Sequence, residues 1–300
     1  MAFLHLINSV FLVLMLWATS LGLGMQFTLQ EILAPLKRVR LIGLAVLLNV
    51  VVVPLIAWGL TRALPIDPGY ATGILLVGFA AAAPASLKLA QIARGDLPYA
   101  VSLVVLLSVL NIAAIPLWSA LLMPGSVSIN PLEVASTLLI NVLLPLCIGL
   151  LIKARYADQA REWAPLLNKL STLALLIVLV SSIVVDFSTL LSLIGSFAML
   201  AGILLVLLAF VLGYVLGGTD QASRRVTSTV TGSRAVGPAL LIATQSFPTD
   251  PKVTAGVLAV GLLGSFLPAI VALEWGRRSA GQREAAPEHV QPGQEIPQMG

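Results

Sequence analysis

The sequence predicts an all-α polytopic membrane protein with about nine transmembrane helices. Of its residues, 58% are hydrophobic and only 10% are charged, whereas roughly a quarter of a soluble domain is charged. The mean hydropathy is +1.01, and apolar runs of about 20 residues, long enough to cross the hydrocarbon core as helices, recur along the chain. Because so few polar residues cannot cover a water-exposed surface, lipid must be the solvent for most of this chain.

The apolar runs define the expected helices in order. They lie at 3–23, 41–63, 70–93, 98–121, 131–152, 165–185, 190–217, 222–246 and 252–274. The first run has no Lys or Arg before it, so we do not expect a cleaved signal peptide. We expect a transmembrane domain over residues 1–278 and a disordered cytoplasmic tail over 279–300, a stretch that contains almost no large apolar residues.

Loop charges predict the orientation of the helices. If the nine helices alternate in direction, Arg62 and Lys252 face one side and most other loop cations face the opposite side. That opposite side carries Lys37, Arg38, Arg40, Arg94, Lys153, Arg155, Arg161, Arg224, Arg225, Arg277, Arg278 and Arg283. The positive-inside rule therefore places the N-terminus outside and the C-terminus in the cytoplasm, in an inner or plasma membrane. The same rule explains the basic isoelectric point, and we expect no nucleic-acid partner.

Two cations, Lys88 and Arg234, fall well inside apolar runs and are expected to be buried. No carboxylate lies at the same depth in any run. A Lys or Arg at the centre of a membrane costs roughly 2.5–3.5 kcal/mol on insertion scales. We expect both side chains to line a polar cavity and attract an anionic ligand. The alternative is that water or backbone carbonyls merely accommodate them. Lys169 lies near the start of its helix, where it can snorkel.

Both runs that carry these cations contain helix-breaking residues. Pro84 removes a backbone donor four residues before Lys88, and Gly232, Gly237 and Pro238 bracket Arg234. We therefore expect discontinuous helices at about 70–93 and 222–246, whose exposed half-helix ends bind anions. The hydroxyls of Thr231 and Ser233 adjoin Arg234 and are candidate ligand contacts. For each segment alone, a kink without function is the alternative.

The spacing of these segments predicts an internal repeat. Lys88 and Arg234 are about 146 residues apart, and the neighbouring runs recur at a similar offset, 41–63 with 190–217 and 98–121 with 252–274. Matching helices are five helices apart and thus run in opposite directions. This is an inverted-topology repeat, a design in which the ligand site lies where the repeats meet.

Residues from about 10 to 275 resemble the bile acid:sodium symporter family. The resemblance rests on the stretch 22–29, on Val-Gly at 77–78, on Ala-Ser at 85–86, on Ala-Arg-Gly-Asp at 93–96, on Asn49 with Pro54 and Trp58, and on the Gly232…Gly237 segment. It implies a panel domain and a core domain, two broken helices that cross in the core, and alternating access. It also implies substrate binding beside the crossing, which adds Asn49 and Ser86 to the candidate residues.

The chain departs from the family where the resemblance implies sodium ligands. Leu87, Val230 and Ala235 stand at those positions, and Ala100 and Val104 replace hydroxyl ligands on the next helix. Sodium requires oxygen ligands, as other hard cations do. The chain is thus similar to divergent bacterial-type members that lack most sodium-site residues. We expect no metal, no sodium coupling, and fixed positive charge from Lys88 and Arg234. A buried Lys can titrate, which makes a proton a candidate coupling ion.

The expected function is secondary transport of a small organic anion, such as a bile-acid-like, keto or hydroxy carboxylate, without a cofactor. A sodium-coupled symporter, as in the family, and a passive anion channel or sensor are the alternatives. An arsenite exporter of related fold is disfavoured because residues 79–88 contain no cysteine. An enzyme is disfavoured because Ser86 and Lys88, two apart on a helix, do not face each other.

Overall fold

The computed structural model describes residues 2–123, 130–185, 187–193 and 195–284, and every regular element within them is helical. The first half contains α1 (Ala2–Gln26), α2 (Leu29–Leu33), α3 (Val39–Leu47), α4 (Val53–Ala63), α5 (Pro68–Phe79), α6 (Ser86–Ile92), α7 (Leu97–Leu122) and α8 (Pro131–Leu138). The second half contains α9 (Leu144–Arg155), α10 (Ala157–Val185), α11 (Phe187–Leu193), α12 (Phe197–Leu216), α13 (Gln221–Gly232), α14 (Val236–Ser246) and α15 (Pro251–Glu284). The all-α membrane fold expected from composition is confirmed.

Six helical segments of the described chain are long and apolar enough to span a membrane: Ser9–Gln26, Val39–Ala63, Leu97–Leu122, Pro131–Arg155, Phe197–Leu216 and Pro251–Arg278. The other three predicted spans fall on the broken pairs α5/α6 and α13/α14 and on α10. The count of nine membrane crossings therefore stays a prediction. α15 continues to Glu284, so residues 279–284 of the expected tail are helical, and 285–300 lie outside the described residues.

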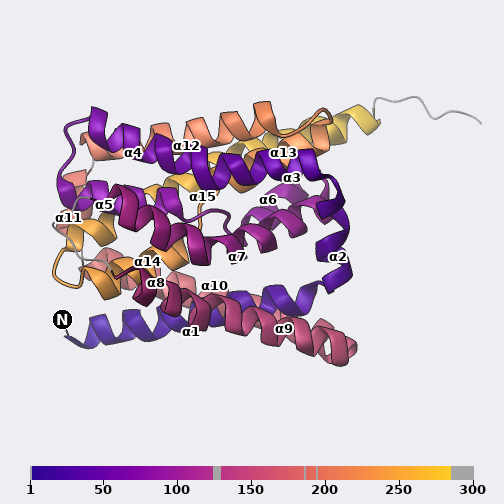
Figure 1. Ribbon diagram of the computed structural model, residues 1–300, viewed down its shortest axis with the longest axis horizontal. Helices are drawn as coiled ribbons and strands as arrows, with labels where there is room; N and C mark the ends of the chain where they lie inside the picture. The colour runs from indigo at the N-terminus through magenta and orange to yellow at the C-terminus, as the bar shows by residue number, and fades with distance from the viewer. Residues whose placement is uncertain (1, 124–129, 186, 194, 285–300) are drawn as a thin grey trace, which may run out of the picture.

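The helices form two layers (Figure 1). α1, α9 and α10 pack side by side and make the panel layer, together with α8, which leads into α9. The core layer holds the two broken pairs, with α5 packed on α15 and α13 packed on α12, and also contains α3, α4 and α7. Within the panel layer, glycines let α1 and α9 come close: a side chain on Gly24 of α1 would collide with the backbone of α9.

Two long helices contain a wide π turn just before a proline. The segment Leu48–Val52 joins α3 to α4 ahead of Pro54, and Leu139–Leu143 joins α8 to α9 ahead of Pro145. Pro54 cannot donate to the carbonyl of Val50, four residues earlier. The indole of Trp118 donates to that carbonyl instead, at 2.6 Å. The first π turn also contains Asn49, which is fully buried and belongs to the site described below.

The basic loops gather at one end of the molecule (Figure 1). The α2–α3 connection and the ends of α6, α9 and α15 lie there, together with the start of α13. The opposite end holds the α4–α5 and α14–α15 connections, where Lys252 forms a 2.6 Å ion pair with Asp67. This segregation is the pattern that the positive-inside rule requires, and the placement of either end relative to a membrane stays a prediction.

Candidate functional site

The two broken helices cross at their breaks. α5 ends at Phe79 and the helix resumes at Ser86, while α13 ends at Gly232 and resumes at Val236. Two backbone hydrogen bonds join the two break segments. Ala83 N–H donates to the carbonyl of Ser233, and Ala235 N–H donates to the carbonyl of Ala80, both at 3.0 Å. The pairing runs in opposite directions along the two segments. Discontinuous crossing helices were predicted, and the structure contains them.

The first break is held by an asparagine that the sequence reasoning did not select. Asn111 of α7 accepts a hydrogen bond from Ala81 N–H at 2.9 Å and donates to the carbonyl of Ala81 at 2.7 Å. The next residue, Ala82, has a φ of 51°, a left-handed conformation that costs a non-glycine residue about 1 kcal/mol. A side-chain amide within a largely apolar helix is costly in lipid, and this feature of the sequence could have identified Asn111.

The second break follows from its glycine and proline residues. Gly237 lies against the side-chain ends of Leu16 and Met15 of α1, so the start of α14 packs on the panel layer. Pro238 is in the first turn of α14, where backbone N–H groups have no partner within the helix. Gly232 packs against Phe210 of α12. All four predicted helix-breaking residues, Pro84 included, therefore lie at or directly beside the crossing.

Arg234 is buried, with 2% of its surface exposed, and its guanidinium donates three hydrogen bonds to polar groups of the core layer. Nε donates to the carbonyl of Val77 at 3.3 Å and Nη2 to that of Gly78 at 2.6 Å. These carbonyls belong to the last turn of α5, and that of Val77 also accepts a hydrogen bond from the cap residue Ala80. A cation at a helix C-terminus is stabilised by the helix dipole. Arg234 thus neutralises the end of α5 within the crossing.

Asn49, in the π turn between α3 and α4, binds two residues of the second broken pair, Arg234 and Thr231. Its Oδ1 accepts from Nη1 of Arg234 at 3.1 Å, and its Nδ2 donates to Oγ1 of Thr231 at 2.9 Å and to the carbonyl of Ala45. The described residues form three ion pairs, Arg38–Asp96, Asp67–Lys252 and Glu274–Arg278, none of which involves the crossing. Neutral oxygens therefore replace a carboxylate counter-ion around Arg234, which is the accommodation by backbone carbonyls considered above as the alternative.

A cavity of about 420 Å³ separates the crossing from the panel layer. Its walls come from α1, α7, the α8–α9 segment, α10 and α15 and from the crossing residues 82–85, 87, 88 and 234–238. The polar part of the lining consists of Thr19, Ser20, Gln26, Lys88, Ser108, Asn111, Asn168, Ser171, Thr172, Arg234 and Ser265. None of the described lining residues is an aspartate or glutamate. The remaining walls are aliphatic, apart from Phe266, so the cavity suits an organic anion.

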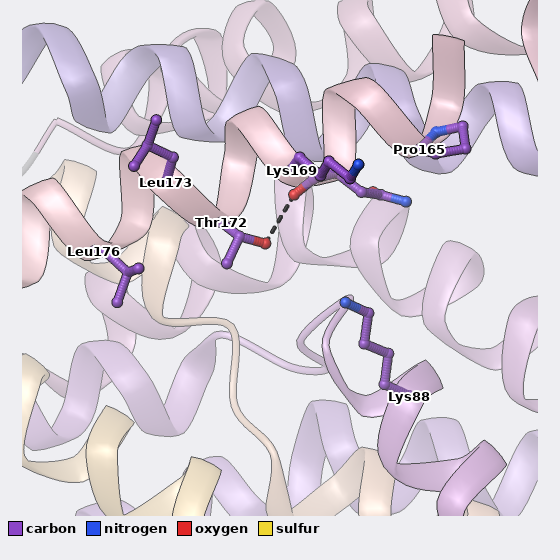
Figure 2. Close-up of a pocket in the computed structure, with 7 residues that line it drawn as sticks. Lys88, Pro165, Lys169, Thr172, Leu173 and Leu176 are labelled. Carbon is purple, nitrogen blue, oxygen red and sulfur yellow. Dashed lines mark hydrogen bonds between the residues drawn. The ribbon is translucent and has the colours of Figure 1, made fainter. Parts of the chain in front are cut away.

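Lys88 lies at the mouth of this cavity (Figure 2). Its side chain extends from the start of α6 towards α10, where Lys169 and Thr172 line the same opening. The prediction that Lys88 is buried is wrong, because the side chain is exposed. α6 begins at Ser86, and its first turn, which carries Lys88, faces the gap between the layers. Among the described residues, Lys88 Nζ has neither a hydrogen-bond nor an ion-pair partner.

The other predicted contacts lie behind the cavity wall. Ser86 is buried and donates to the carbonyl of Ala83 at 2.6 Å, and Thr231 accepts from Asn49. Ser233 is 4% exposed, and its hydroxyl has no partner among the described residues. None of these three hydroxyls, nor Asn49, lines the cavity. Their contact with a ligand stays a prediction, and the structure gives Asn49 and Thr231 a role in holding the crossing together.

The positions where the resemblance implies sodium ligands are apolar and packed. Val230, Ala100 and Val104 are fully buried in one hydrophobic cluster with Ala82, and Leu87 packs against it. Ala235 is in the break itself and lines the cavity. These side chains provide no oxygen, and a sodium ion needs several oxygen ligands to replace its water shell. The residues present do not fit a sodium site of the family type.

Comparison with known proteins agrees with the resemblance found in the sequence. The family model described as "Sodium Bile acid symporter family" matches residues 10–193. A similar protein is the "Probable sodium/metabolite cotransporter BASS1, chloroplastic" of Arabidopsis thaliana, with 27% identity over 269 residues, which are 89% of this chain and 67% of the relative. The match to the family model contains the first broken pair, most of panel helix α1, and the panel helices α8, α9 and α10.

Proposed function

Because the chain belongs to the sodium bile acid symporter family, we propose that it is a secondary transporter that moves a small organic anion by alternating access without sodium coupling. Membership makes it a multi-pass membrane transporter with a small-molecule substrate. One observation carries the anion proposal. Lys88 lines a cavity beside the crossing of two broken helices, and no carboxylate is present in the described lining.

The electrostatics of the cavity support an anionic substrate. Lys88 is a compact, strongly hydrated charge on a flexible chain, and its ammonium group is available to a ligand at the cavity mouth. Arg234 also lines the cavity and contributes fixed positive charge, although it donates hydrogen bonds to Val77, Gly78 and Asn49. The aliphatic walls favour a carbon skeleton, so a bile-acid-like, keto or hydroxy carboxylate fits better than an inorganic anion.

The location of the cavity supports alternating access. It lies between the panel layer and the crossing, so movement of one layer against the other would expose it to each side in turn. We propose that the basic end of the molecule faces the cytoplasm, with the N-terminus outside, in an inner or plasma membrane. A fluorescent tag that folds only in the cytoplasm, fused to the C-terminus, should therefore be bright. A dark fusion with normal expression would contradict this orientation.

The absence of sodium coupling rests on the packed cluster of Val230, Ala100 and Val104. Arg234 already places a permanent cation at the crossing, between the end of α5 and Asn49, so a bound cation is not required to hold these elements together. A proton remains a candidate coupling ion. Sodium coupling is the second candidate, because the Arabidopsis relative is named a sodium/metabolite cotransporter.

Uptake into proteoliposomes tests the proposal directly. A thermal-shift screen of carboxylates on the purified protein would select a substrate, whose radiolabelled form is then supplied with sodium or with choline as the outside cation. We expect equal uptake in both, saturable exchange in preloaded vesicles, and loss of uptake in Lys88→Gln but not in Lys37→Gln, which removes an exposed lysine elsewhere. A strict sodium requirement would overturn the coupling proposal, and non-saturable flux would indicate a channel.

A further inference from the structure

A second cation stands across the cavity mouth from Lys88. Lys169 belongs to α10 of the panel layer, whereas Lys88 belongs to α6 of the core layer, and both line the same opening (Figure 2). Asn168 and Thr172 line both this opening and the cavity behind it, so the opening is continuous with the cavity. Sequence reasoning assigned Lys169 to snorkelling alone. Its position opposite Lys88 is a result of the tertiary fold.

Neither lysine is neutralised by the protein. Among the described residues, Lys169 Nζ, like Lys88 Nζ, has no hydrogen-bond or ion-pair partner, and no acidic residue lines the opening. Arg234 differs, because carbonyls and an amide oxygen surround its guanidinium. The mouth therefore presents two uncompensated positive charges, one on each layer, that repel each other across the gap.

We infer that the substrate of the proposed transporter is a dianion, with one carboxylate on Lys88 and the second on Lys169. This inference rests on the proposed function and specifies its substrate class. The side-chain amide of Asn168 has no partner among the described residues and can donate to either carboxylate. Pro165, Leu173 and Leu176 form the apolar part of the opening and suit a short methylene spacer. The class is a short α,ω-dicarboxylate.

Charge balance explains why a dianion would be preferred. A monocarboxylate neutralises one lysine and leaves the positive charge of the other lysine uncompensated, whereas a dianion neutralises both. An exposed ion pair changes a binding constant by up to about fivefold. Because the lysines belong to different layers, a bridging dianion also favours the conformation in which the layers approach each other at this mouth. Substrate binding would thereby promote closure of the side on which it occurred.

Snorkelling of both lysines to lipid phosphates is the competing explanation. The experiment therefore uses full-length protein in nanodiscs of phosphatidylcholine, with no net lipid charge, and a second set containing phosphatidylglycerol. The probes are succinate and its monomethyl ester, which has the same carbon skeleton and one negative charge. Dissociation constants are measured for the wild type, Lys169→Gln, Lys169→Arg, Lys88→Gln and the control Lys37→Gln.

We expect succinate to bind the wild type up to about fivefold more tightly than the monoester in phosphatidylcholine. Lys169→Gln should remove this preference while monoester binding persists, Lys169→Arg should retain it, and Lys88→Gln should weaken both ligands. Equal binding of the two probes, or unchanged selectivity in Lys169→Gln, would overturn the dianion inference and leave the anion transporter standing. Stabilisation by phosphatidylglycerol alone would overturn it in favour of lipid binding. Failure of every carboxylate to bind would contradict the proposed function itself.

Discussion

Arg234 and Lys88 look alike in the sequence and occupy opposite environments in the fold. Each is a cation beside a broken helix in an apolar run without a carboxylate. Arg234 is 2% exposed and donates to two carbonyls at the end of α5 and to Asn49. Lys88 is exposed at the cavity mouth and, among the described residues, has no partner. The same signal therefore marks a structural cation in one case and a ligand-facing cation in the other.

The difference follows from which part of each broken pair carries the cation. Arg234 is in the break, where the carbonyls of Val77 and Gly78 at the end of α5 are within reach. Lys88 is in the first turn of α6, after the break, where its side chain extends away from the crossing towards α10. A planar guanidinium with five donors suits the first environment, and a flexible ammonium suits the second. The comparison predicts that substitutions at the two sites affect different properties.

The largest expected effect is on folding, at Arg234. Arg234→Gln would leave the carbonyls of Val77 and Gly78 and the Asn49 amide oxygen without their charged donor. Each buried acceptor left unpaired in this way costs about 1–3 kcal/mol. We expect a strongly lowered melting temperature or aggregation in fluorescence-detected size exclusion. Arg234→Lys should recover part of the loss. Wild-type stability in Arg234→Gln would refute its structural role and restore it as a ligand group.

Asn111 should show an intermediate effect, again on stability. Asn111→Ala removes both hydrogen bonds to Ala81 and leaves a buried N–H and carbonyl unpaired, at a cost of about 2 kcal/mol. The matched control is Ser108→Ala on the same helix, whose hydroxyl bonds only to the carbonyl of Val104 within its own helix. We expect a clear drop in melting temperature for Asn111→Ala alone. Equal stability of both variants would show that the first break holds without this clamp.

Lys88 should affect binding and leave folding unchanged. Lys88→Gln removes an exposed charge that has no protein partner among the described residues, so the melting temperature of the ligand-free protein should stay near the wild-type value. Loss of an exposed ion pair with a carboxylate should weaken ligand affinity by up to about fivefold. Isothermal titration with the selected carboxylate measures this. A stability loss like that of Arg234→Gln would erase the distinction between the two sites.

The smallest effect concerns the ion pair of Asp67 and Lys252 at the opposite end, which shows what an ordinary partnered cation contributes. The hydrogen bond from Lys252 lowers the pKa of Asp67, as does the Gly69 N–H that its carboxylate caps. A lowered pKa in the folded state means that stabilisation is present above the unfolded pKa and is lost as pH falls through the folded pKa. The melting temperature should therefore fall when the pH is lowered below the range in which aspartate ordinarily titrates. In Asp67→Asn this dependence should shrink slightly, because exposed pairs contribute little.

The sequence by itself determined the membrane class, both broken helices and the family. Long apolar runs, loop charges and the Pro and Gly residues of the two segments act locally, through hydrophobic transfer and backbone restrictions that do not depend on the rest of the fold. The sequence also identified Lys88 and Arg234 as unusual, because a charge in an apolar run is costly wherever the helix lies.

Only the tertiary structure decided what each of these residues does. Asn49 reaches Arg234 across 185 positions of the chain, Asn111 reaches the Ala81 backbone, and Lys169 lines the same opening as Lys88, although nothing in local sequence relates these residues. Hydrogen bonds and electrostatic interactions depend on distances of a few ångströms, and the packing of the two layers sets those distances. Burial separates Arg234 from Lys88 for the same reason, since exposure is a property of the assembled helices.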